Sequence, residues 1–145
     1  MTPLYPFNVD RPFIRDAWYP AAFSGNVGRT LIQQTIMEEP IVLFRTEAGV
    51  AQAMWGLCPH RNYPLVEGRL VGDEIQCSYH GYRLAVDGKC TRIPGQNTVP
   101  ARFCQRIYPC TEKAGLVWVW MGAPEQADPG LLRSAHPDPD QTCLL

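Results

Sequence analysis

The chain has 145 residues, of which 13 are basic, 14 are acidic and 46% are hydrophobic. This length and apolar content suit one ordinary domain with its own core, which excludes two full enzyme domains and a mostly disordered protein. The balanced charge gives no electrostatic indication of a nucleic-acid partner or of an anionic membrane surface.

The chain begins without a basic start followed by an apolar run, so its first residues are not a predicted secretory signal. No segment approaches the roughly 20 apolar residues that span a bilayer. We expect a lead over residues 1–15, one domain over 16–122 and a tail or linker over 123–145. We further expect a cytoplasmic protein, in whose reducing compartment cysteines serve as ligands or buried thiols instead of disulfides.

Short apolar and β-branched runs recur between turn residues, which is typical of an all-β domain. The predicted strands are residues 30–37, 41–45, 50–55, 75–77, 82–85, 106–110 and 116–120. The sequence Glu38-Glu39-Pro40 is the predicted turn between the first two strands. The last two strands are expected to pair with each other through residues 112–115, and the strand pattern stops at Gly122.

Two short segments each combine one cysteine with one histidine. They are Cys58-Pro59-His60 and Cys77-Ser78-Tyr79-His80, and 16 residues separate them. Ligands in one arm of a tetrahedral zinc site are usually about two to four residues apart, and Cys-x-His is tighter than that. The same donors suit two adjacent irons, with both cysteines on one and both histidines on the other, as in Rieske 2Fe-2S centres. A zinc site stays open as an alternative, and colour and iron content would distinguish the two.

The longer segments Cys58-Pro59-His60-Arg61 and Cys77-Ser78-Tyr79-His80-Gly81-Tyr82 resemble the two cluster loops of Rieske proteins. The surrounding sequence, from Asp16-Ala17-Trp18-Tyr19 to the Trp118–Gly122 segment, resembles the amino-terminal domain of the oxygenase component of Rieske non-haem iron aromatic-ring oxygenases. The vanillate demethylase group is the most similar in pattern. The resemblance implies the Rieske iron-sulfur fold, an antiparallel β-sandwich with a small cluster-binding subdomain.

The resemblance also implies a ligand set for a 2Fe-2S cluster. By this similarity Cys58 and Cys77 bind the buried iron, whereas His60 and His80 bind the outer iron. The edges of the two imidazoles would then face solvent or a partner protein.

Three tyrosines stand where Rieske members related to respiratory complexes have other residues. Those members carry a cysteine in each loop that ties the loops by a disulfide, and here Tyr63 and Tyr79 occupy the corresponding positions. Tyr82 replaces a serine that would donate a hydrogen bond to a bridging sulfide. Because hydrogen bonds to the sulfurs favour the reduced cluster, we predict a potential near the low end of the Rieske range, about −150 mV.

The implied function is transfer of single electrons. The donor would be an NAD(P)H-dependent reductase or a ferredoxin, and the acceptor a non-haem iron oxygenase domain acting on aromatic compounds. That acceptor iron is held by two histidines and a carboxylate, and His136 is the one histidine left after the cluster loops. We therefore expect no such site in this sequence. A stand-alone Rieske ferredoxin and a zinc-binding interaction module are the alternative functions.

The other cysteines show no paired spacing and are expected to be buried or incidental thiols. They are Cys90, Cys104, Cys110 and Cys143.

Overall fold

The computed structural model describes residues 13–132, and this part of the chain is built from strands. Eleven strands form three antiparallel sheets. The only helices within residues 13–132 are single 3-10 turns, and none of them is long and apolar enough to cross a membrane. The predicted all-β class is confirmed.

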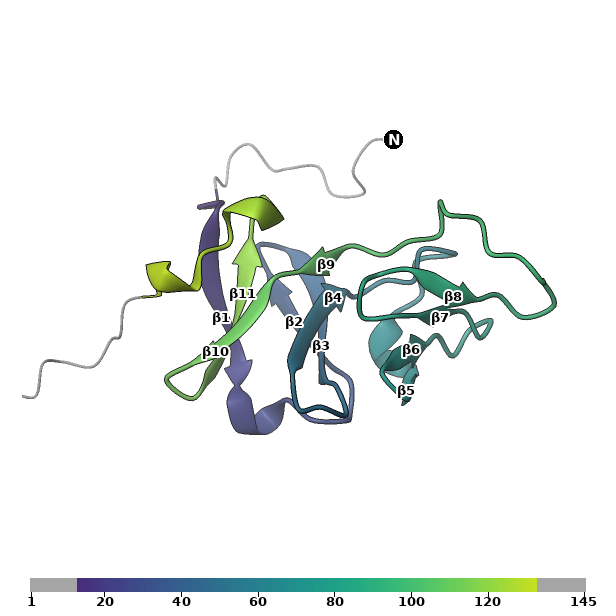
Figure 1. The fold of residues 1–145 in the computed structure, drawn as a ribbon, viewed down its shortest axis with the longest axis horizontal. Coiled ribbons are helices and arrows are strands. Elements are labelled where there is room, and N and C mark those ends of the chain that lie inside the picture. The colour runs from purple at the N-terminus through teal and green to yellow at the C-terminus, as the bar shows by residue number, and fades with distance from the viewer. Residues whose placement is uncertain (1–12, 133–145) are drawn as a thin grey trace, which may run out of the picture.

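Two of the sheets form the part of the molecule that we call the base, residues 13–56 and 106–132 (Figure 1). One has the order β1 (Ala17–Phe23), β11 (Leu116–Met121), β10 (Cys110–Lys113). The other has the order β2 (Ile32–Ile36), β3 (Glu39–Arg45), β4 (Ala51–Trp55), β9 (Ile107–Tyr108). Their facing side chains form one apolar core, to which Val117 and Val119 of β11 contribute.

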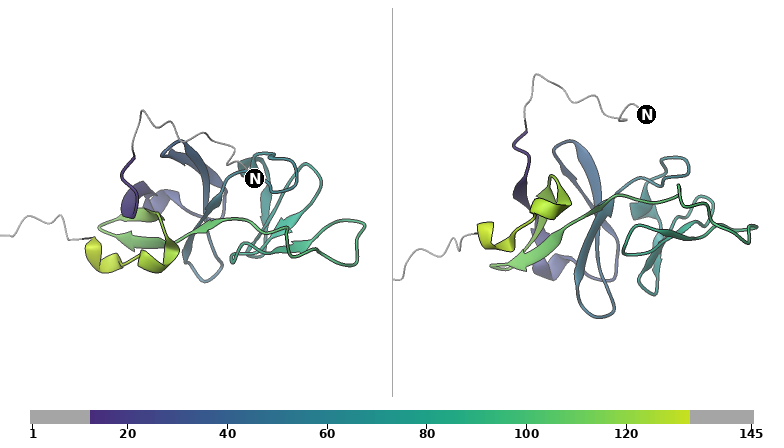
Figure 2. Two further views of the ribbon diagram at one scale, coloured as in Figure 1. Left: turned by 90° about the horizontal axis from the view of Figure 1, so that it is seen from above. Right: turned by 45° about the horizontal axis from the view of Figure 1, so that its top comes forward.

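The third sheet lies at the opposite end of the molecule from β1, β10 and β11 (Figures 1 and 2). It consists of β5 (Arg69–Val71), β6 (Glu74–Gln76), β7 (Arg83–Leu84) and β8 (Cys90–Arg92) in sequential order. We call residues 57–105, which contain this sheet, the outer subdomain. Its core is separate and includes Leu65, a residue of the 3-10 helix η2 (Leu65–Glu67), together with Ile75 and Leu84.

Strand β3 joins the two cores. Side chains alternate between the two faces of a strand, and here both faces are buried. Ile41 and Leu43 pack in the core of the base, whereas Val42 and Phe44 pack in the core of the outer subdomain. All four side chains are fully buried. Each such side chain contributes about 1.5–3 kcal/mol by leaving water. Strand β4 reaches both cores as well, through Ala53 in the base and Met54 in the outer subdomain, so these two strands fix the outer subdomain to the base.

The first hairpin turns earlier than predicted. Met37 and Glu38 form its turn with φ angles of +52° and +63°, the left-handed conformation that a type I′ hairpin turn has at both positions. Glu39 and Pro40 therefore begin β3 instead of forming the turn. Pro40 has no N–H to donate, but its carbonyl accepts a hydrogen bond from the N–H of Gly56 at 2.8 Å.

The predicted pairing of residues 106–110 with residues 116–120 is wrong except at Cys110, which pairs with Val119. Ile107 and Tyr108 pair with β4, and only Cys110–Lys113 pairs with β11. Pro109 separates the two short strands, because it has no N–H with which to continue a ladder. The chain changes from one sheet to the other at this residue, while the Pro109 carbonyl accepts a hydrogen bond from Trp120.

Residues 123–132 lie against the sheet of β1, β10 and β11. They contain two single 3-10 turns, η3 (Pro124–Gln126) and η4 (Pro129–Leu131). The indole N–H of Trp120 donates to the Ala123 carbonyl and that of Trp18 to the Asp128 carbonyl, both at 2.8 Å. The boundaries predicted at residues 15/16 and 122/123 stay predictions, and both His136 and Cys143 lie outside the described residues.

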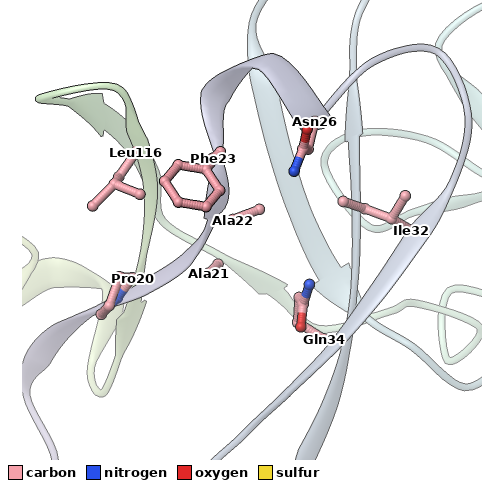
Figure 3. Close-up of a pocket in the computed structure, with 8 residues that line it drawn as sticks. All are labelled: Pro20, Ala21, Ala22, Phe23, Asn26, Ile32, Gln34 and Leu116. Atoms are coloured by element: carbon pink, nitrogen blue, oxygen red, sulfur yellow. The ribbon is translucent and has the colours of Figure 1, made fainter.

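A hollow of about 490 Å³ lies in the base between β1 and β2 (Figure 3). Its lining is mostly apolar and includes Phe23, Ile32 and Leu116, while Asn26 and Gln34 supply the polar groups. None of the residues that line it is ionisable or a thiol. This hollow therefore offers neither metal ligands nor an acid or base.

Candidate metal centre

The first Cys/His loop follows strand β4 and is closed by its own backbone. The N–H of Cys58 donates to the Tyr63 carbonyl, and the N–H of Asn62 donates back to the Cys58 carbonyl, both at 2.8 Å. Asn62 has a φ of +55°, a conformation that asparagine adopts more readily than most residues. The loop thus turns back on itself within six residues and presents His60 at its tip.

The second loop follows strand β6 and repeats the same closure. Here the N–H of Cys77 donates to the Tyr82 carbonyl at 2.8 Å, and the N–H of Gly81 donates to the Cys77 carbonyl at 3.0 Å. Gly81 has a φ of +78° and stands four positions after its cysteine, as Asn62 does in the first loop. The two loops differ mainly in where the histidine lies, since His80 is one position later than its counterpart.

The four donors meet as two pairs. The thiols of Cys58 and Cys77 are each 2% exposed and interact with one another. The imidazoles of His60 and His80 lie nearer the surface, with ring centroids 4.9 Å apart and planes inclined by 69°. Within residues 13–132, no three His, Cys, Asp or Glu side chains converge as they would around one ion. A buried thiol pair beside an outer imidazole pair suits two adjacent metal ions.

The surroundings tune both kinds of donor. Burial raises the pKa of the Cys58 thiol to about 11, although backbone N–H groups of His60 and Arg61 donate to the sulfur and act in the opposite direction. A metal that binds this sulfur must therefore displace its proton. The pKa of His60 is lowered, first by burial and then by the nearby charges of His80 and Arg61. The neutral imidazole, which is the form that binds metals, is thereby favoured.

Aromatic rings pack around the imidazole pair. Tyr82 stacks on His60 with centroids 4.5 Å apart and an interplanar angle of 13°. Tyr79 lies 3.9 Å from His80 and also stacks on Tyr63 of the other loop at 5.1 Å. At the two positions where a disulfide is excluded, the loops are thus held by stacked tyrosines, a contact that the sequence analysis did not predict.

The structure brings the four predicted ligand residues together as two pairs, Cys58 with Cys77 and His60 with His80. It also has a feature that the sequence did not predict. A hollow of about 360 Å³ lies beside the second loop and is lined in part by Arg69, Gln76, Cys77 and Gly81. Gly68 also lines this hollow, and only glycine fits there, because a Cβ at this position would lie 2.3 Å from the Gln76 carbonyl oxygen. No local motif marks this hollow, since it is formed by strands that meet only in the folded sheet.

Comparison with known proteins gives a consistent result. Residues 17–107 match the family described as the Rieske 2Fe-2S domain. The chain is 41% identical over 118 residues to the iron-sulfur subunit of the toluene-4-sulfonate monooxygenase system of Comamonas testosteroni, covering 81% of this chain and 34% of that protein. It is 35% identical over 120 residues to the vanillate O-demethylase oxygenase subunit of a Pseudomonas species, covering 83% and 34%.

Among solved structures, apo dicamba monooxygenase superposes with a TM-score of 0.78 at 39% identity, covering 87% of this chain and 38% of that one. The chain thus spans about a third of the length of the relatives that it matches. The similarity lies in the sheets and loops described above.

Proposed function

The chain belongs to the Rieske 2Fe-2S domain family, and we propose that Cys58 and Cys77 hold one iron of its cluster while His60 and His80 hold the other. The pairing of donors supports this assignment: the thiols interact with one another, and the imidazole centroids are 4.9 Å apart. The equal backbone closure of the two loops, each begun by a cysteine, is the observation that carries it.

The chain binds a 2Fe-2S cluster and takes part in electron transfer. When bound, the cluster supplies one-electron chemistry. The residues of the chain control access to it. Cys58 and Cys77 are buried and exclude water from the inner side, whereas the His80 side chain is exposed. A partner protein therefore reaches the site most closely through the imidazole edges.

We further propose that the chain is the electron-accepting module of an oxygenase system that acts on aromatic compounds. Its relatives are components of such systems by their names, which include a toluene-4-sulfonate monooxygenase and a vanillate O-demethylase. In this proposal a reductase or a ferredoxin donates the electron, and a mononuclear non-haem iron centre accepts it.

The ligand assignment is tested by loading the chain with iron and sulfide without oxygen, followed by absorbance and by electron paramagnetic resonance of the reduced protein. The wild-type chain should show the signal of a histidine-ligated iron pair. Cys58→Ser and His60→Asn should abolish or alter it, whereas the matched controls Cys104→Ser and His136→Asn should leave it unchanged. A colourless protein that binds zinc, or an unaltered signal in Cys58→Ser, would refute the assignment.

A further inference from the structure

A row of arginines crosses the outer face of the β5–β8 sheet. Arg69 pairs with Gln76 and Gln76 with Arg83, and Arg83 pairs with Arg92 where the register of β7 and β8 shifts, so one residue from each strand follows the same line. Residues directly opposite in a sheet place their side chains on the same face. The adjacent row, which contains Ile75 and Leu84, faces the core. We call the outward line of Arg69, Gln76, Arg83 and Arg92 the arginine row.

Among residues 13–132, no arginine of the arginine row forms an ion pair with a carboxylate. In the base, every described arginine has a carboxylate partner: Arg15 and Arg106 with Glu39, Arg29 with Asp73, and Arg45 with Glu112. Within the described residues, the arginines of the outer subdomain form no ion pair. They are Arg61, Arg69, Arg83, Arg92 and Arg102. Arginines with and without a carboxylate partner are thus divided between the base and the outer subdomain.

The outer subdomain also has more basic than acidic residues, whereas the rest of the chain has fewer. Residues 57–105 contain six Arg and Lys against four Asp and Glu, whereas the rest of the chain contains seven against ten. Two of those four carboxylates are already paired, Asp73 with Arg29 of the base and Asp87 with Lys89. The other two lie near the arginine row: Glu67 lines the 360 Å³ hollow with Arg69, and Glu74 is two positions before Gln76 in β6. The outer subdomain is therefore a positive end on a chain of nearly neutral charge.

The local chemistry of the arginine row is unfavourable for the chain by itself. Like charges directly opposite in a sheet are destabilising, and Arg83 stands opposite Arg92. The Nε of Arg83 is buried and has no hydrogen-bond partner among the described residues. Only Arg69 is partly satisfied, since it donates to the Gln76 side-chain oxygen at 3.1 Å and 3.2 Å. Departures from stabilising patterns of this kind concentrate at functional surfaces.

The arginine row adjoins the metal centre. Gln76 precedes the ligand Cys77, and Arg83 follows Tyr82, whose ring stacks on His60. Arg69 and Gln76 also line the 360 Å³ hollow that reaches Cys77 and Gly81. A protein held on this face would lie beside the second loop and leave the imidazole edges free.

We infer that the arginine row is the docking surface for the electron donor, and that the donor presents a cluster of carboxylates to it. The inference rests on the proposed function, because it presupposes a loaded cluster that accepts one electron. Unpaired arginines match carboxylates in charge and in hydrogen-bonding geometry. The donor loses the electron that the cluster gains, and no proton or bond is exchanged.

The test uses an acidic plant-type 2Fe-2S ferredoxin as the probe. Reduced ferredoxin is mixed with the loaded, oxidised chain by stopped flow, and binding of the two oxidised proteins is measured separately by calorimetry, both at low and high ionic strength. Arg69→Gln and Arg92→Gln should each lower the association rate about threefold at low ionic strength, because opposite charges steer encounter. They should weaken binding in parallel, and the differences should vanish at high ionic strength.

Lys113→Gln removes the same charge from β10 of the base and is the matched control, for which wild-type rates and binding are expected. Dithionite reduction and the absorbance spectrum of each variant report the cluster independently of docking. If all variants load and reduce normally but Arg69→Gln and Arg92→Gln match the control, the docking inference is overturned and the proposed function stands. If the wild-type chain does not load or reduce, the proposed function itself fails.

Discussion

Two replacements of Tyr82 distinguish the contribution of its ring to the stability of the fold from that of its hydroxyl. The side chain is 7% exposed, stacks on His60 and makes an edge contact with Phe103 at 5.8 Å. Within residues 13–132 the Tyr82 hydroxyl makes no hydrogen bond. Tyr82→Ala therefore removes a buried ring and leaves a cavity, whereas Tyr82→Phe removes only an unbonded oxygen.

The expected magnitudes differ clearly. Truncation of a buried aromatic side chain to alanine costs about 3–5 kcal/mol, a large share of the roughly 5–15 kcal/mol that stabilises a domain. For a domain of this size, that corresponds to a decrease in Tm of about 10–20 °C. Tyr82→Phe should change the Tm by no more than about 2 °C, because it breaks no hydrogen bond and leaves the ring packed, a change of about 0.5 kcal/mol or less.

The assay is thermal unfolding of the cluster-loaded protein at one scan rate, followed by far-ultraviolet circular dichroism and by bleaching of the cluster absorbance. Tyr79→Ala is the matched control, because Tyr79 lies beside the same imidazole pair but is 53% exposed. It should lower the Tm by only a few degrees, about 1 kcal/mol or less. Equal decreases in Tyr82→Phe and Tyr82→Ala would show that the hydroxyl matters and would refute the reasoning.

Three further predictions concern the cluster and the base. The reduction potential of the loaded chain should lie near −150 mV, about the low end of the Rieske range, and a value well above zero by potentiometric titration would contradict this. Hydrogen bonds from Arg45 hold the pKa of Glu112 below its usual value. The pair therefore stabilises the fold above the unfolded-state pKa of that carboxyl, and this contribution is lost as the pH falls through the lowered folded-state pKa. Glu112→Gln should make the Tm depend less on pH at acidic pH. An unchanged dependence would contradict the contribution of this ion pair. A Cβ at Gly122 would lie 2.7 Å from the backbone of Asp16, whereas one at Gly25 meets no atom within 4 Å. Gly122→Ala should lower the free energy of unfolding, measured with denaturant, by about 1–3 kcal/mol, and Gly25→Ala should lower it far less. Equal effects of the two substitutions would argue against a steric cause.

The parts of the fold that local sequence specifies were predictable. Each candidate loop is a short segment with its cysteine, its histidine and its left-handed residue in sequence, and its hydrogen bonds close within six residues. Strands with clear apolar runs, such as β2, β3, β4 and β11, could also be placed roughly, whereas β1, β5 and β8 were not predicted. The Met37–Glu38 turn escaped prediction because neither residue is glycine, although both have positive φ.

Features that depend on strand register were not predictable from one sequence. Nothing near Pro109 indicates that the strand before it pairs with β4 and the strand after it with β11. The arginine row has the same origin, since Arg69, Arg83 and Arg92 become neighbours only when four strands align. Their charges were visible in the sequence, but their common face was not.

The stacked pair of Tyr63 and Tyr79 bears on how the two loops respond to reducing agents. An aromatic pair contributes about 0.5–1.5 kcal/mol, whereas a disulfide between loops typically contributes about 2–4 kcal/mol. A stack of this strength opens spontaneously and reversibly, and it needs no oxidant to form. The contact between the two loops at Tyr63 and Tyr79 is therefore insensitive to reducing agents, which would break a disulfide at the same positions.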